Sequence, residues 1–140
     1  MKPSTLRQQI ALKVAGLAGF KESTHSPDLF GRTQNTVAHK AFSVGLSTSQ
    51  GVDERQRRAV GVYMNTPVQV IFSYRLRPLD VYPVDYDLAL DAEVDVIHAV
   101  LEAYSTPNEF TIRYLSSSRE VTDSQEYVII TLDFQALHTI

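Results

Sequence analysis

Hydrophobic residues occupy every second position in four segments of the chain, a period that is typical of strands with one buried face. The alternating residues are Phe42, Val44 and Leu46, then Val68, Val70, Phe72, Tyr74 and Leu76, then Phe110, Ile112 and Tyr114, and finally Val128, Ile130, Leu132 and Phe134. Pro67 stands just before the second of these runs. Because proline has no backbone N–H to donate, we expect an edge position, a bulge or a break near residues 65–66.

Two other segments have the helical period of three to four residues. In the first, the apolar positions are Leu6, Ile10, Val14 and Leu17. The tetrapeptide at residues 5–8, TLRQ, has the form of a capping box at the start of this helix, and Gly16 and Gly19 are expected to end it. In the second, the apolar positions are Leu90, Val94, Ile97, Leu101 and Tyr104. We expect this second stripe to face the core.

The predicted elements follow the order α-β-β-α-β-β. Hairpins separated by helices favour an α+β fold, with a mostly antiparallel four-stranded sheet and two helices packed on one face. With 140 residues, the chain is expected to form one domain that spans residues 1–140. The polar segment 47–58 is expected to form a mobile hairpin tip, and residues 116–125 a polar turn. No predicted helix covers the second face of the sheet, so that face should be wet or form an interface.

Composition narrows the possible functions. The chain is 44% hydrophobic and 21% charged, which is ordinary for a globular protein. It has no cysteine, so it has no disulfide framework, no thiolate metal site and no cysteine nucleophile. No apolar run is long enough to cross a membrane. The formal net charge of −3 argues against a protein whose main task is to bind duplex nucleic acid.

Candidate chemistry is sparse. The four histidines are His25, His39, His98 and His138, and no HExxH, GxSxG or phosphate-binding glycine motif accompanies them. His25 and His39 flank a polar loop and could form a catalytic pair, although two partly exposed histidines are the more ordinary interpretation. We therefore predict no catalytic, cofactor-binding or metal-binding residues and no enzymatic activity.

An acidic row lies on the second predicted helix. Asp87, Asp91, Asp95 and His98 fall on one side of it and could share a divalent cation. Metal sites usually take ligands from several elements, however, so a solvated or subunit-facing row is the simpler interpretation.

Two groups of arginines are candidates for contacts with partners. Arg75 and Arg77 lie at the end of the second long strand, on the face that we expect no helix to cover. The cluster Arg55, Arg57 and Arg58 lies in the polar tip beside two acidic residues. The cluster could touch phosphates, but its balanced charge favours a loop that contacts a protein partner.

The order of these elements forms a distinctive layout. A capped helix, a strand and a long polar excursion precede a second strand that ends in YRLRPLD. The helix DYDLALDAEVDVIHAVLEAY and a final strand, EYVIITLDFQAL, follow. This layout resembles the tail terminator, or tail-completion, proteins of long-tailed bacteriophages, over most of the chain.

The resemblance implies a structural protein of the virion, assembled in the host cytoplasm. It implies a homo-oligomeric ring of six subunits that caps the head-proximal end of the tail tube, stops polymerisation of the tube and joins the tail to the neck and head. The partners would be the tail tube protein and neck or connector proteins, with DNA only passing through the lumen and no cofactor or membrane involved. In such a ring, we expect Arg75 and Arg77 of one subunit to meet Asp87, Asp91 and Asp95 of the next.

Three alternatives remain open from the sequence. One is another head–tail connector or neck component. The second is a small cytosolic enzyme that uses His25 or His39. The third is a nucleic-acid-binding module that uses Arg55, Arg57 and Arg58.

Overall fold

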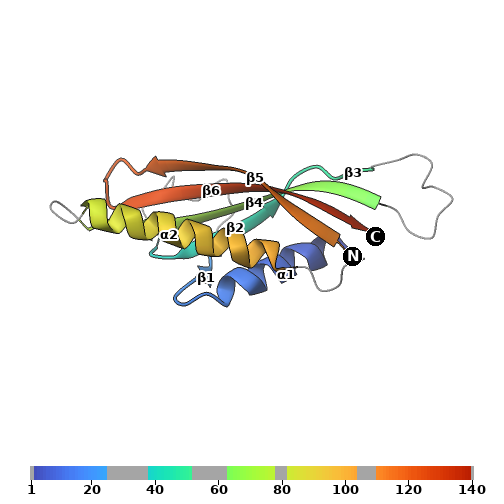
Figure 1. Cartoon of the computed structure of the whole chain (residues 1–140), viewed down its shortest axis with the longest axis horizontal. Helices are drawn as coiled ribbons and strands as arrows, with labels where there is room; N and C mark the ends of the chain where they lie inside the picture. The colour runs from blue at the N-terminus through green and yellow to red at the C-terminus, as the bar shows by residue number, and fades with distance from the viewer. Residues whose placement is uncertain (1, 25–37, 52–62, 78–81, 104–109, 140) are drawn as a thin grey trace.

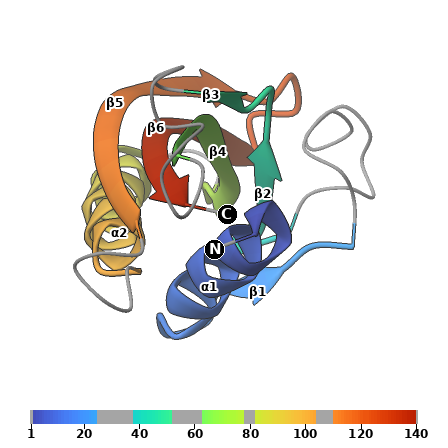
Figure 2. The same ribbon diagram turned by 90° about the vertical axis from the view of Figure 1, so that its right-hand side faces the viewer.

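The computed structural model describes residues 2–24, 38–51, 63–77, 82–103 and 110–139. Within these residues, two helices and six strands follow one another (Figure 1). They are α1 (Pro3–Ala15), β1 (Lys21–Glu22), β2 (Ala41–Leu46), β3 (Gln50–Gly51), β4 (Tyr63–Arg75), α2 (Tyr82–Leu101), β5 (Phe110–Val121) and β6 (Tyr127–Thr139). The predicted α+β class is confirmed, and both helices lie on the same side of the sheet (Figure 2).

The strands form one sheet with the order β1-β2-β4-β6-β5, and β3 pairs with β4 beyond the end of β2. The prediction of four strands was therefore too low, because two-residue strands such as β1 and β3 are too short to show alternation. The sheet is mixed, since β1 and β2 run parallel and all the other pairs are antiparallel. The two long strands β4 and β6 pair over thirteen residues, from Tyr63 opposite Thr139 to Arg75 opposite Tyr127.

Pro67 lies inside β4, which is a central strand and continues through the proline without a break. The break occurs in the neighbouring strand instead. The pairing of β2 with β4 ends at Leu46 opposite Val68, and β3 takes over at Gln50 opposite Asn65. The carbonyl of Pro67 accepts a hydrogen bond from Ser47 N–H in this gap. Pro67 has no backbone N–H to donate, and it lies where the neighbour of β4 changes from β2 to β3.

The core fills the layer between the sheet and the two helices. The alternating strand residues contribute its largest members, Phe42, Phe72 and Phe134, all fully buried. Every alternating residue of β6 from Val128 to Ala136 is also completely buried. The predicted alternation of the long strands is thereby confirmed for β2, β4 and β6.

Helix α1 buries Leu6, Ile10 and Val14, as the spacing predicted, and Leu17 packs partly buried against them. The predicted capping box is wrong, because the helix begins three residues earlier than that box requires, at Pro3. Lys2 occupies the N-cap position, and its carbonyl accepts from Leu6 N–H at 3.0 Å. Proline suits the first helical position, where its fixed φ is already helical and no N–H is needed.

Helix α2 does not bury the predicted stripe. The apolar residues on its buried face are Ala89, Ala92, Val96, Ala99 and Val100. Val94 is 47% exposed, and Leu90, Ile97 and Leu101 are only partly buried at the margin. The small alanine side chains face the core instead. The prediction that the stripe of larger residues marks the buried face was therefore wrong.

Strand β5 extends further than predicted. Residues 116–121 continue the strand, and the turn before β6 takes only residues 122–126. The register of β5 against β6 shifts between Tyr114 and Ser116, which leaves Leu115 in a bulge. A bulge changes which side chains share a face, so a polar run in this part of the strand does not look like alternation.

Candidate assembly interface

Helix α2 begins beside the end of β4, and Arg77 joins the two elements. Its guanidinium donates from Nε to Oδ1 and Oδ2 of Asp85, at 3.2 and 3.0 Å, and from Nη2 to Oδ1 at 2.8 Å. The backbone N–H of Arg77 also donates to Oδ2, at 2.6 Å. Asp85 is buried in the first turn of α2, where the helix dipole favours a negative charge. Arg77 thus satisfies a buried carboxylate of its own chain.

These hydrogen bonds keep the pair ionised. The Arg77 side chain lowers the pKa of Asp85, and the backbone N–H of the same residue lowers it further. Asp85 in turn raises the pKa of Arg77. Arg75, two residues earlier, is exposed and forms no ion pair within the described part of the chain. The two arginines that the sequence places together therefore differ in what they contact, and only Arg75 is free to bind a partner.

A groove of about 300 Å³ lies beside this ion pair, between the end of β4 and the start of α2. His39 and Tyr74 form its aromatic wall, with their ring centroids 4.6 Å apart, and Leu88 of α2 borders it. Nδ1 of His39 accepts a hydrogen bond from Arg75 N–H at 3.2 Å. Burial lowers the pKa of His39, and Lys40 and Arg75 lower it further, so the imidazole is neutral at neutral pH.

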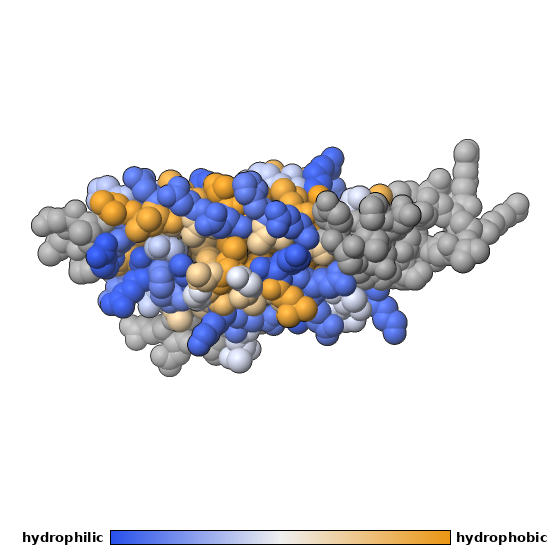
Figure 3. All heavy atoms as spheres, turned by 60° about the horizontal axis from the view of Figure 1, so that its bottom comes forward, coloured by the Kyte–Doolittle hydropathy of each residue, from blue (hydrophilic) through white to orange (hydrophobic). Residues whose placement is uncertain are grey.

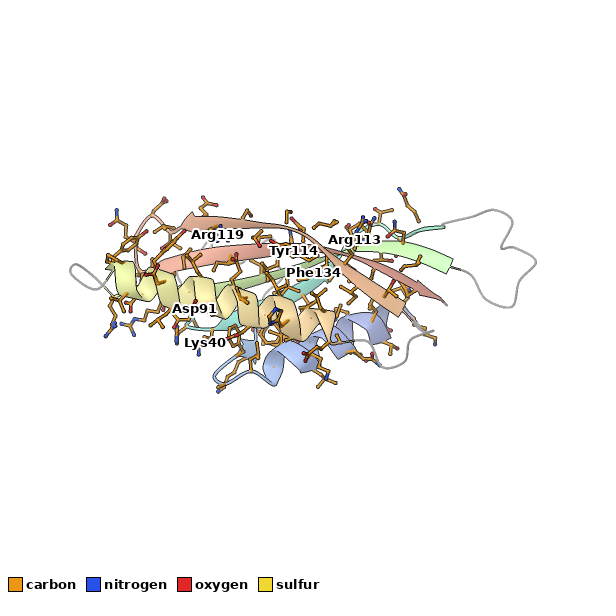
Figure 4. All side chains as sticks on the ribbon, in the orientation of Figure 1. Lys40, Asp91, Arg113, Tyr114, Arg119 and Phe134 are labelled. Atoms are coloured by element: carbon orange, nitrogen blue, oxygen red, sulfur yellow. The ribbon has the colours of Figure 1, made fainter. Side chains whose placement is uncertain are left out.

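The outer surface of α2 carries a mixed row of side chains, which we call the α2 strip: Val84, Asp87, Leu88, Asp91, Val94 and Asp95. All six are exposed. The three aspartates make no ion pair with any described residue. Figure 4 shows Asp91 on the side of α2 away from β5, and Figure 3 shows apolar patches among polar atoms on the helix-bearing face. Exposed aliphatic residues beside unpaired charges are typical of a protein contact surface.

The other side of α2 is tied to β5 by a contact between Glu93 and Arg119. Figure 4 shows Arg119 on β5. Arg119 Nη2 donates to Glu93 Oε2 at 2.6 Å. Glu93 is buried, and its second oxygen, Oε1, has no hydrogen-bond partner among the described residues. The hydrogen bond to Glu93 raises the pKa of Arg119. No pattern in the sequence indicates this pair, because a carboxylate within an acidic helix looks solvent-exposed.

The histidines do not converge on one site. His98 is exposed on α2, and His138 is buried at the end of β6, where its Nε2 lies 2.7 Å from Thr66 Oγ1. That hydroxyl also lies 2.7 Å from Ser49 Oγ. Among the described residues, no three His, Asp or Glu side chains gather closely enough to hold a metal ion. His25 lies outside the described residues.

No described helix covers the second face of the sheet, but this face is only partly exposed to solvent. Ile71 and Ser73 on β4 are buried, and Ser73 Oγ donates to the carbonyl of Ala38, so the chain near residue 38 covers this part. Further along, a groove of about 560 Å³ crosses the sheet beside Gln69 and Asp133. Arg55, Arg57 and Arg58 lie outside the described residues. Neither described helix combines the length and the apolar character that a membrane span needs.

Comparison with known proteins finds solved structures that are similar to this chain. No protein-family model and no curated protein sequence matches the chain. A chain in the solved structure "Virion of native gene transfer agent (GTA) particle" is similar to this chain, with a TM-score of 0.44 and 13% sequence identity. The similarity covers 96% of this chain and 92% of that chain.

Proposed function

We propose that this protein is a structural component of a phage-like virion: a tail terminator whose subunits form a ring of six on the head-proximal end of the tail tube. The ring stops growth of the tube and joins the tail to the neck. The residue patterns that resemble tail terminators support this proposal, and their order along the chain matches the order α1, β2, β4, α2, β5, β6. Its role is assembly, and it carries out no reaction and needs no cofactor.

The observation that carries the proposal is the α2 strip. A subunit of a ring must present a contact surface to its neighbour, and such surfaces mix aliphatic residues with charges. Leu88 is 46% exposed and Val94 is 47% exposed. The same helix buries mainly small residues on its inner face. Asp91 and Asp95 beside them are unpaired and can hold arginines of the next subunit. Arg75 is one such arginine, whereas Arg77 is already bound to Asp85.

The test is assembly in solution and on tubes. The purified protein should form rings in negative-stain electron microscopy, alone or when mixed with the tail tube protein encoded beside it, and should halt tube growth. The double change Asp91→Lys, Asp95→Lys should abolish rings and capping while the circular dichroism spectrum stays unchanged. Asp123→Lys, in the turn between β5 and β6, alters a similar exposed charge and should assemble normally.

The assembly test also distinguishes a tail terminator from another connector or neck component. A different connector or neck component would form an oligomer but would not bind tube ends. A protein that neither forms oligomers nor binds tubes would overturn the proposal.

A further inference from the structure

Strand β5 forms a long free edge of the sheet. It pairs with β6 on one side, and no other described strand pairs with it. The edge runs from Phe110 to Val121, twelve residues, and no other described strand offers an edge of this length, because the opposite edge strand, β1, has two residues. Unpaired backbone N–H and C=O groups on such an edge are a template for another strand.

The bulge at Leu115 sorts the side chains of β5 into two sets. Arg113 lies opposite Gln135, and Glu120 lies opposite Ile129, so both point to the face without helices. Tyr114 lies opposite Phe134, and Arg119 opposite Ile130, so both point to the helix-bearing face. Arg113 bonds Gln135 and Arg119 bonds Glu93, in agreement with these directions. Without the bulge, Arg113 and Glu120 would lie on opposite faces.

This arrangement makes the edge complementary to itself. If a second β5 runs antiparallel to the first with Ser117 opposite Ser117, the register set by β6 brings Arg113 opposite Glu120 at both ends of the contact. Tyr114 then lies opposite Arg119, a pairing that suits a guanidinium against an aromatic ring. Opposite charges across a pair of strands stabilise it, and three serines at the centre, residues 116–118, leave room for close approach.

We propose that two copies of this protein pair through their β5 edges, antiparallel and about a two-fold axis at Ser117, to give one sheet that runs through both subunits. The occupant of the free edge is thus a second copy of the same strand. Charged residues and a bulge can also serve to protect an edge from pairing. Here, however, the charges attract in the self-paired register, since Arg113 of each copy meets Glu120 of the other, while protective charges of one sign would repel.

The contact is separate from the α2 strip and does not depend on the proposed ring. A two-fold contact uses the same patch on both copies, so it cannot by itself form a ring in which subunits are joined head to tail. It instead joins subunits in pairs, whatever the α2 strip binds. The two contacts can therefore be tested independently, with the β5 contact measured in the Asp91→Lys, Asp95→Lys background.

Charge reversal tests the register. Sedimentation of that background protein should show a concentration-dependent dimer. Arg113→Glu and Glu120→Arg should each weaken the dimer at least tenfold, because each sets like charges opposite one another at both ends. An equimolar mixture of the two variants should recover a dimer, since the acidic edge of one then meets the basic edge of the other. Glu126→Arg, an exposed change in the adjacent turn, is the matched control and should leave the dimer intact.

Cross-linking tests the two-fold axis. The chain has no cysteine, so Ser117→Cys introduces a single thiol that should form a disulfide-linked dimer under mild oxidation. Ser124→Cys, in the turn, should not. A protein that is monomeric at its highest soluble concentration, or a dimer that survives both charge reversals, would overturn the β5 contact. Either result would leave the proposed ring untouched, because ring formation is measured on the unmodified α2 strip.

Discussion

Helices α1 and α2 pack on the same face of the same sheet, yet they divide their large apolar residues differently. In α1, the large aliphatic residues Leu6, Ile10 and Val14 all point inward, and only Leu12, at 72% exposed, points out. In α2, alanines make up much of the buried face, and larger aliphatic residues lie outside. A helix that carries large aliphatic residues on its outer side has a second surface to cover, which is why α2 is the better candidate for a subunit contact.

The two helices also differ in charge. Helix α1 carries Arg7 and Lys13 and no acidic residue, while α2 carries five acidic residues and no lysine or arginine. The chain neutralises the two acids of α2 that are buried, Asp85 through Arg77 and Glu93 through Arg119. The three that remain are the exposed aspartates of the α2 strip. Burial therefore explains the paired acids, and only the unpaired ones call for an external partner.

The largest effect that would sharpen this comparison comes from two leucines on α1. Leu6→Ala should lower the free energy of unfolding by about 2–5 kcal/mol, because Leu6 is completely buried and its loss leaves a cavity. Leu12→Ala, the same change on the outer side, should stay within about 0.5 kcal/mol. Urea denaturation of both variants measures the difference. Equal losses would mean that Leu12 is covered in the free protein.

A smaller effect distinguishes the two faces of α2. Val96→Ala should cost about 2 kcal/mol, since Val96 is fully buried and two methyl groups leave the core. Val94→Ala should hardly change the stability of the monomer but should weaken assembly if the α2 strip is a contact surface. Thermal melts and negative-stain images of the two variants provide the measurement. A destabilised Val94→Ala with an unaffected Val96→Ala would restore the face that the sequence predicted.

How far the sequence predicted the molecule depends on which signal each element carries. Strands β2, β4 and β6 and helix α1 were predicted well, because their large apolar residues and their buried positions coincide. The face of α2 was not, because alanine contributes little to an apolar stripe and Glu93 is an unusual core residue. The bulge at Leu115 and the two-residue strands leave no periodic trace. The Arg77–Asp85 pair spans eight residues of chain, and no spacing rule connects a strand end to the next helix across that distance.

The acidic row on α2 shows what helical spacing can predict and what depends on tertiary contacts. Asp87, Asp91 and Asp95 were correctly placed on one exposed side of a helix, since helical geometry alone fixes that relation. Whether an arginine is free to meet them depends on tertiary contacts. Arg75 and Arg77 are both arginines and lie two residues apart, so the sequence does not distinguish them. The fold brings Arg77, and not Arg75, to Asp85.

The smallest effect separates these two arginines. Arg77→Ala should lower the melting temperature, because Asp85 keeps only the backbone N–H of residue 77 as a donor. The loss should be smaller than for Leu6→Ala, since the Arg77 side chain is 60% exposed and water weakens its ion pair. Arg75→Ala, the matched control, should leave the melting temperature of the monomer unchanged. An equal loss in both variants would mean that the ion pair with Asp85 does not stabilise the fold.

The pH dependence of that loss identifies its cause. Arg77 lowers the folded-state pKa of Asp85, so the stability it provides is present above the unfolded pKa of about 4 and is lost as the pH falls through the lower, folded pKa. The melting temperatures of the wild type and Arg77→Ala should therefore converge as the pH is lowered below about 4. His39, whose pKa is also lowered, makes both proteins less stable as the pH falls through about 6.5, which is above the range in which Asp85 titrates. A gap between the two proteins that persists in acid would show that Arg77 acts through packing of its aliphatic stem and not through the charge of Asp85.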